Sequence, residues 1–252
     1  MKRQPLPLLI TAIVMIATVS PAKAQVFRPK YEYGLSLGVL LYQGDLTPER
    51  FGAAKTMKFA WALSAARILS PSMTIKGQFL RGRLRGDDSK YASPEYRQQR
   101  NFNFTTPVTE LSVQLVYNPL GKNDADKGFA PYLFAGGGLA FLNIKRNWQG
   151  INGEYFTAQT APNVWNGLAI DTAKSLPKMI PVIPAGAGLR YYINTHWSVN
   201  AETSYRFNYT DYLDGFSESV NPKLNDHYVN YSVGVVYRRG GKDKLGCPVV
   251  KY

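Results

Sequence analysis

Eight segments with the side-chain pattern of β-strands run through this sequence, and the connectors between them are alternately long and short. The alternation is clearest over 197–208, where one face is apolar from Trp197 to Phe207 and the other carries Glu202 and Arg206. Strands that turn apolar side chains to lipid and polar ones to an enclosed lumen are typical of transmembrane β-barrels. The sequence therefore predicts an all-β fold, an eight-stranded antiparallel outer-membrane β-barrel with a closed lumen.

The order of strands and connectors also predicts sidedness. We expect strands over 31–42, 57–68, 73–83, 109–118, 131–143, 180–193, 197–208 and 229–237. The long connectors lie at 43–56, 84–103, 144–179 and 209–226, and the short ones at 69–72, 120–130 and 194–196. Long loops of such barrels face the outside and short turns face the periplasm. An even number of strands then puts both termini in the periplasm.

The first residues have the pattern of a secretory signal peptide. Lys2 and Arg3 precede an apolar stretch over 6–19, and Ala22-Lys23-Ala24 forms a small-x-small cleavage site. An uncleaved anchor helix would need about 20 apolar residues, and this stretch breaks at Pro21. We expect a signal peptide over 1–24, a barrel domain over 25–238 and a periplasmic tail over 239–252.

The chain is strongly basic, with a formal net charge of +13 that falls to +10 if Lys2, Arg3 and Lys23 leave with the signal peptide. An exported protein rarely meets nucleic acid, so we expect no nucleic-acid partner. Outer-membrane lipid, lipopolysaccharide and acidic protein surfaces are the expected counterparts of this charge.

An eight-stranded barrel encloses only enough space for its own side chains, so we expect no diffusion pore. The polar parity predicts the lumen-facing residues Lys76, Gln78, Glu110, Gln114, Arg190, Asn200, Glu202 and Arg206. Buried charges must pair to offset their desolvation. We therefore expect Glu110 and Glu202 to form salt bridges with Arg190, Arg206 or Lys76. The alternative for these carboxylates is a proton relay or a catalytic pair.

The candidates for catalysis are weak. Asp226 precedes His227, but adjacent residues of a strand point to opposite faces, so the carboxylate cannot easily orient the imidazole. One cysteine and two distant histidines cannot form a zinc centre. The acidic residues Asp211, Asp214, Glu218 and Asp226 lack the spacing of a calcium loop. We expect a non-enzymatic protein without catalytic residues, cofactor or metal.

Three arginines, Arg81, Arg83 and Arg85, share the parity of Phe79 in the third strand. If that parity faces lipid, the arginines emerge at the headgroup level, where guanidinium groups can bind the phosphates of lipopolysaccharide. The alternative is that they are solvated or paired with Asp87-Asp88.

The chain continues past the last predicted strand as a basic segment that contains its only cysteine. The candidates for docking a partner, or for an intermolecular disulfide, are Arg238, Arg239, Lys242, Lys244 and Cys247. An odd cysteine in an oxidising compartment favours an intermolecular bond or a reactive thiol. A tail with an idle thiol is the other interpretation.

Four segments in this order carry a family resemblance. They are Tyr-Gln-Gly-Asp-Leu at 42–46, Phe-Thr-Thr-Pro-Val-Thr-Glu-Leu at 104–111, Phe-Ala-Pro-Tyr-Leu-Phe-Ala-Gly at 129–136 and Tyr-Thr-Asp-Tyr-Leu-Asp at 209–214. The chain resembles the PorG-type barrels of Bacteroidota, a DUF6089-like family, from about Tyr31 to the Gly-Cys-Pro of the tail.

The resemblance implies a component of the type IX secretion system, which exports proteins across the outer membrane. Barrels of this type are thought to associate with a periplasmic ring that contains a lipoprotein. The implied role is non-catalytic anchoring of that ring, with the basic tail on the periplasmic side. The alternative is a free-standing OmpX-like or OmpW-like barrel that binds surface ligands or conducts a small apolar solute.

Overall fold

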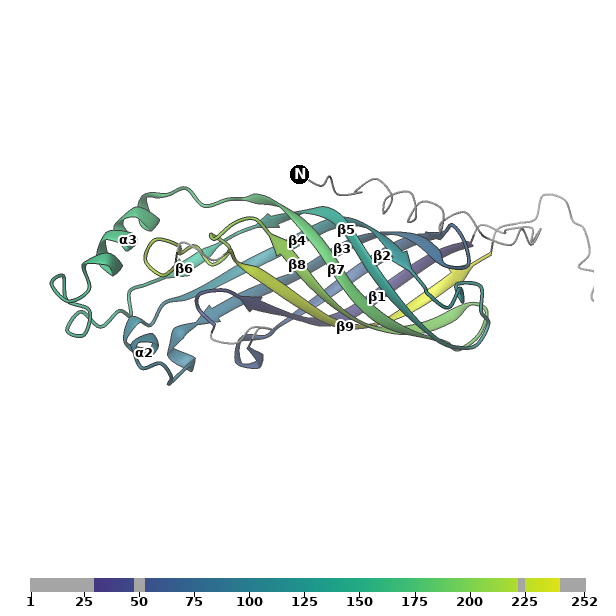
Figure 1. Ribbon diagram of the computed structural model, residues 1–252, viewed down its shortest axis with the longest axis horizontal. Helices are drawn as coiled ribbons and strands as arrows, with labels where there is room; N and C mark the ends of the chain where they lie inside the picture. The colour runs from purple at the N-terminus through teal and green to yellow at the C-terminus, as the bar shows by residue number, and fades with distance from the viewer. Residues whose placement is uncertain (1–29, 48–52, 222–224, 241–252) are drawn as a thin grey trace, which may run out of the picture.

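Eight long antiparallel strands close into a barrel in the computed structural model, which describes residues 30–47, 53–221 and 225–240 (Figure 1). The strands are β1 (Lys30–Gln43), β2 (Lys58–Ile68), β3 (Met73–Asp87), β4 (Asn103–Tyr117), β5 (Gly128–Leu142), β7 (Met179–Tyr192), β8 (Trp197–Asn208) and β9 (His227–Arg239). Each pairs with its neighbours, and the β1–β9 and β3–β4 pairings complete the circle. The predicted all-β, eight-stranded fold is confirmed.

The two ends of the barrel differ. The short-turn end carries the connectors 69–72, 118–127 and 193–196. The start of β1 and the end of β9 lie there too, because Tyr31 pairs with Arg239. The cap end carries the long connectors and the small elements that the structure describes (Figure 1). These are η1 (Ala54–Thr56), η2 (Asp88–Lys90), α2 (Tyr96–Arg100), β6 (Lys145–Asn147) and α3 (Pro162–Ala173).

The strand boundaries match the predictions best at β8 and differ most at β3 and β4. β3 continues to Asp87 and β4 begins at Asn103, because the segment from Arg83 to Asp87 pairs with the segment from Asn103 to Pro107. The extension carries charged side chains on its outward face, so it lacks the apolar alternation by which the strand was predicted. Its hydrogen bonds nevertheless continue the ladder beyond the apolar wall.

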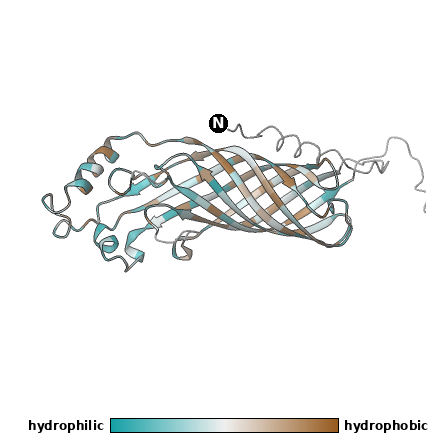
Figure 2. Cartoon of the chain, viewed as in Figure 1, coloured by the Kyte–Doolittle hydropathy of each residue, from teal (hydrophilic) through white to brown (hydrophobic). Residues whose placement is uncertain are grey.

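The outward face of the barrel is apolar around its middle. In Figure 2, brown hydrophobic stretches alternate with paler and teal ones along the strands, while α2 is mostly hydrophilic. Aromatic residues flank this band at both ends. They include Tyr31, Phe129, Tyr191, Trp197 and Tyr237 toward the short-turn end, and Phe59, Trp61, Phe79, Phe141 and Phe207 toward the cap end. Apolar bands bordered by aromatic girdles are the lipid-facing surface of membrane barrels. Among the described residues, no helix has the length and apolarity to cross a bilayer.

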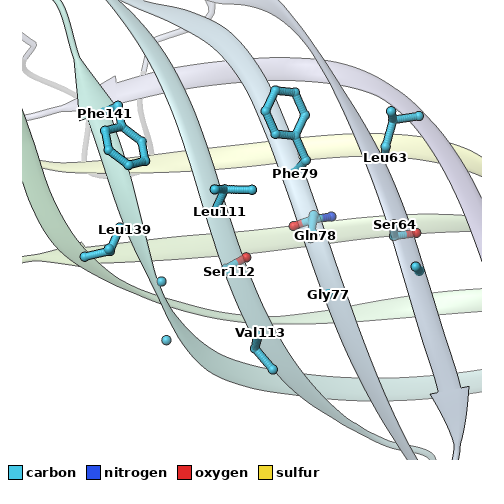
Figure 3. Close-up of a pocket in the computed structure, with 13 residues that line it drawn as sticks. Leu63, Ser64, Gly77, Gln78, Phe79, Leu111, Ser112, Val113, Leu139 and Phe141 are labelled. Atoms are coloured by element: carbon cyan, nitrogen blue, oxygen red, sulfur yellow. The ribbon is translucent and has the colours of Figure 1, made fainter.

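Small residues leave a shallow depression in this outer wall (Figure 3). Ala65, Gly77, Val113 and Gly137 lie in one row across β2, β3, β4 and β5. Larger side chains surround the row: Leu63, Phe79, Leu111, Leu139 and Phe141. Because the depression opens onto the lipid-facing wall, we expect lipid acyl chains to fill it.

Candidate functional site: a filled lumen beneath a folded cap

A three-residue charge cluster closes the lumen at the short-turn end. Arg190 donates from Nη1 to both carboxylate oxygens of Glu32 at 2.9 Å, and Arg238 Nε lies 3.7 Å from Glu32 Oε1. Arg238 also donates to the carbonyl oxygens of Ala125, at 2.7 Å, and Asn123, at 2.6 Å. The cluster thus ties β1, β7 and β9 to the connector between β4 and β5.

This position corrects the expectation for Arg238. We expected it to dock a partner, but it belongs to β9 and its side chain is only 1% exposed. The physical reason is parity: Arg238 follows Val236 on the inward face of β9, so its guanidinium group enters the barrel. Arg239 is exposed on the outward face, whereas Lys242, Lys244, Cys247 and the predicted signal peptide lie outside the described residues.

The middle of the lumen is filled by a second group. Lys76 Nζ lies 3.1 Å from Glu202 Oε1, and the same oxygen accepts hydrogen bonds from Tyr132 Oη at 2.7 Å and Asn200 Nδ2 at 3.0 Å. Beside it, Gln114 donates to Gln78 at 2.9 Å. These residues come from β3, β4, β5 and β8, so the group crosses the whole barrel.

A third group lies toward the cap end. Arg206 Nε contacts Glu110 Oε2 at 3.2 Å, and Tyr228 donates to the same oxygen at 2.8 Å. Both charged side chains are almost fully buried, at 1% and 0% exposure. The structure therefore places Glu110 with Arg206 and Glu202 with Lys76, while Arg190 contacts Glu32, which the sequence reasoning missed.

The side chains of these three groups occupy the described part of the lumen from the short-turn end toward the cap end. A cavity near Tyr132 and Arg190 has a volume of about 10 Å³, which is about the space of one water molecule. Above the third group, buried apolar side chains continue the filling. The interior of the barrel is therefore packed with side chains along the described length.

The long connectors fold onto the cap end and bury apolar side chains there. The rings of Phe102 and Phe216 stack with their centroids 4.6 Å apart, which joins the connectors 88–102 and 209–226. The buried cluster draws on β1, β3, β4, α3 and the first and last connectors, and includes Leu40, Leu46, Leu84, Phe104, Leu168 and Leu213. The cap is therefore a packed structure with its own core.

Asp88 fixes the connector between β3 and β4. Its carboxylate accepts hydrogen bonds from Arg97 at 3.1 Å and from Arg100 at 2.6 Å, and Arg97 also donates to the carbonyl of Asp45 at 3.0 Å. Asp87, by contrast, pairs with Arg85 at 2.8 Å. Asp87 and Asp88 were the alternative partners of Arg81, Arg83 and Arg85. Asp87 pairs with Arg85, and Asp88 pairs with arginines of α2 instead.

Asp171 fixes α3 to the last connector. Its carboxylate accepts backbone hydrogen bonds from Ser217, Glu218 and Ser219 at 3.2, 3.1 and 3.0 Å, and a side-chain bond from Tyr212 at 3.2 Å. The hydroxyl of Ser219 adds a bond of 2.6 Å. One buried carboxylate therefore satisfies three consecutive amides of a loop.

Replacing Asp171 by alanine is expected to release this loop, because three backbone amides lose their acceptor, and the buried amides of Ser217 and Ser219 cost about 1–3 kcal/mol each when unsatisfied. Hydrogen–deuterium exchange of the amides of residues 217–219 measures the effect directly. Asp171→Asn, which keeps one acceptor oxygen, should show an intermediate gain in exchange. Equal protection in wild type and Asp171→Ala would mean that the carboxylate does not hold the loop.

A buried acidic group of the cap surrounds Tyr42. Its hydroxyl oxygen lies 2.7 Å from Asp214 Oδ2 and 2.5 Å from Asp226 Oδ1. A tyrosine hydroxyl has one proton to donate, so one of the two carboxyl groups must donate its own proton to the tyrosine oxygen. His227 does not join this group, since its Nδ1 accepts the backbone N–H of Asn208 at 3.2 Å. Asp226 and His227 therefore form no catalytic pair.

Burial sets the protonation of these carboxyl groups. It raises the pKa of Asp214 and of Asp226 well above the usual value, and at Asp226 the neighbouring Asp214 adds to the effect. Partial burial raises the pKa of Asp45 to about 6 and that of Asp211 to about 7. Within the described ranges no group of three or more histidine, cysteine and acidic residues is arranged to hold a metal ion.

The closed antiparallel barrel, its lipid-facing apolar band and its filled lumen define an outer-membrane-type β-barrel. A family model described as a domain of unknown function, DUF6089, matches residues 8–237, and the chain belongs to this family. No curated protein matches the sequence.

Solved outer-membrane proteins share the architecture at low sequence identity. The attachment invasion locus protein Ail of Yersinia pestis, in complex with a heparin analogue, is 11% identical, with a TM-score of 0.42 and coverage of 84% of this chain and 100% of that chain. Neisserial surface protein A is 14% identical, with a TM-score of 0.44 and coverage of 82% and 96%. A major outer membrane protein of Thermus thermophilus is 11% identical, with a TM-score of 0.43 and coverage of 83% and 99%.

Proposed function

We propose that this protein is a non-catalytic outer-membrane component of the type IX protein secretion system that anchors a periplasmic assembly. The cap end faces the outside in this proposal and the short-turn end faces the periplasm. The observation that carries it is the filled lumen: the polar groups crossing the barrel favour a rigid membrane post over a conduit. The assignment to the type IX secretion system rests on the similarity of the four motifs to PorG-type barrels.

The position of the chain ends supports the anchoring role. β1 begins and β9 ends at the short-turn end, where Arg239 is the last residue of β9. Arg239 is exposed there and precedes Lys242, Lys244 and Cys247 in the sequence. A basic segment tethered to a rigid post is suited to holding an acidic or cysteine-bearing periplasmic partner.

The chemistry of the buried carboxylates supports a structural role over an enzymatic one. Glu110, Glu202 and Asp171 each accept several hydrogen bonds from the protein and are buried. Buried carboxylates that accept hydrogen bonds in this way are suited to stabilising the fold rather than to contacting a substrate. The Tyr42 group is also buried beneath the cap.

Deleting residues 241–252 tests the anchoring role. Affinity isolation of the intact outer-membrane complex under non-reducing conditions should recover a periplasmic lipoprotein with the full chain and lose it with the truncated chain. The barrel should remain folded, because the truncation keeps Arg238 and its contacts with Asn123 and Ala125.

Cys247→Ser is the matched variant for the thiol. If the full chain keeps the partner through a detergent wash and Cys247→Ser loses it, the link is covalent and runs through the thiol. If Cys247→Ser also keeps the partner, the basic residues carry the docking. Unimpaired export of type IX substrates in cells lacking the protein would contradict the proposal. That outcome would favour the free-standing barrel that binds surface ligands.

A further inference from the structure

We infer that the outer wall at the cap end carries a phosphate-binding surface for the headgroup of lipid A. The surface consists of Arg81, Arg83, Arg85 and Lys145, called here the basic rim patch. The inference rests on the proposed orientation, in which the cap end lies at the outer leaflet. It concerns the lipid contact of the barrel and is separate from any protein partner at the other end.

Strand register assembles the basic rim patch from two distant parts of the sequence. Arg81 lies opposite Thr109 of β4, Arg85 lies opposite Thr105, and Thr105 in turn lies opposite Lys145 of β6. All of these residues share the outward face of the sheet. The fold therefore adds Lys145 to the arginine row and places Thr105 between Arg85 and Lys145.

The depth of the patch matches the headgroup layer. Arg81 lies opposite Trp61, whose ring is 5.5 Å from that of Phe79 in the aromatic girdle of the cap end. Arg83 is two residues further along the strand, or roughly 7 Å, which becomes about 5 Å along the membrane normal at a strand tilt of about 40°. The headgroup layer is about 5–8 Å deep on each side. Arg81 and Arg83 therefore span it, with Arg85 and Lys145 at its outer border.

The charges of the patch are largely unneutralised by the protein. Arg81, Arg83 and Lys145 form no hydrogen bond or ion pair with any other residue that the structure describes. The nearest carboxylates are occupied, since Asp87 accepts from Arg85 and Ser89. Asp88 is buried by its own two arginines.

Unpaired guanidinium groups at this depth fit a phosphate ligand. Two arginines on one face, two positions apart, can each present a planar pair of donors, which matches the oxygens of a phosphate group. Desolvation at the membrane surface strengthens such contacts relative to bulk water. Carboxylate ligands would meet the same charges, but the outer leaflet presents phosphorylated glycolipid.

The test compares two double variants with equal charge loss at opposite rims. Arg81→Gln/Arg83→Gln removes the centre of the patch, and Arg67→Gln/Lys127→Gln removes two exposed basic side chains at the short-turn end. Binding of purified lipid A to the full chain in detergent is the measurement. We expect the first variant to bind about tenfold more weakly, which corresponds to about 1.4 kcal/mol, and the second to bind like the wild type.

Chemical controls identify the ligand group. Lipid A from which the phosphates have been removed should bind wild type and both variants equally weakly. Equal binding of lipid A by the two double variants would overturn the inference, as would equal binding of phosphorylated and dephosphorylated lipid A by the wild type. Preference of the wild type for phosphatidylglycerol over lipid A would overturn the assignment to outer-leaflet lipid.

A separate measurement tests the orientation on which the inference rests. Gln159→Cys, in a Cys247→Ser background, places one thiol on an exposed site of the cap. A membrane-impermeant maleimide should label it in intact cells. Labelling only after permeabilisation would overturn the orientation and with it the outer-leaflet assignment. The detergent binding result would still report the phosphate chemistry, and isolation of the periplasmic partner would still report the anchoring role.

Discussion

Replacing Glu110 by leucine is expected to lower the free energy of unfolding by about 3–5 kcal/mol, because it leaves a buried arginine without its counter-ion. Arg206 is 1% exposed and cannot relieve the penalty by losing its proton. Tyr228 also loses its hydrogen-bond acceptor. Urea unfolding of the detergent-solubilised barrel, followed by tryptophan fluorescence, measures the change.

The double variant Glu110→Leu/Arg206→Leu distinguishes a lost ion pair from lost shape. Removing both charges ends the desolvation cost, so the double variant should recover most of the stability that the single variant loses. Glu95→Gln, at an exposed position of the cap, should change stability by less than about 0.5 kcal/mol. A double variant as unstable as Glu110→Leu would mean that packing, rather than charge, determines the stability at this site.

The sequence was sufficient to predict the fold and the inward set of polar residues because period-2 alternation directly encodes which side chains face the lumen. It was insufficient at the strand ends. Glu32 has inward parity in β1, but Gly34, Ser36 and Gly38 on the same face weaken the pattern by which its role would be recognised. Arg238 was grouped with the docking residues because it opens the basic run that follows Tyr237.

The cap could not be predicted, because its contacts join residues that no local pattern relates. Asp171 lies on α3 and accepts amides of the last connector, while Tyr42 of β1 meets Asp214 and Asp226 from the other end of the chain. Connectors have neither of the side-chain periods that identify strands and helices. Their fold depends on which backbone amides find an acceptor, and only the three-dimensional contacts give that.

The carboxyl groups around Tyr42 make the closure of the cap dependent on pH. In the closed cap the pKa of Asp214 and of Asp226 is raised by burial, whereas in an open cap both would titrate near the ordinary value of about 4. The closed form therefore holds more protons than the open form. Closure is most favourable at acidic pH and weakens as the pH rises toward the raised pKa values.

Two flanking carboxyl groups act in the same direction. The pKa of Asp45 is raised to about 6 and that of Asp211 to about 7, both chiefly by burial. As the pH rises through these values, each carboxyl group becomes negatively charged near the Tyr42 group. Arg97 and Arg100 partly offset the charge of Asp45. We expect the equilibrium constant for opening of the cap to increase by up to about tenfold per pH unit for each proton that the closed cap binds beyond those bound by the open cap.

Asp226→Asn is expected to flatten this pH dependence. The amide oxygen can still accept the N–H of Leu213, and the amide nitrogen can donate to the oxygen of Tyr42, so the contacts survive without a titrating group. The rate of hydrogen exchange at residues 212–216, measured from pH 5 to pH 9 and corrected for the intrinsic pH dependence, reports opening. Asp126→Asn, on the exposed connector of the short-turn end, should retain the wild-type profile. If Asp226→Asn also retained it, the shared proton at Tyr42 would have no part in closing the cap.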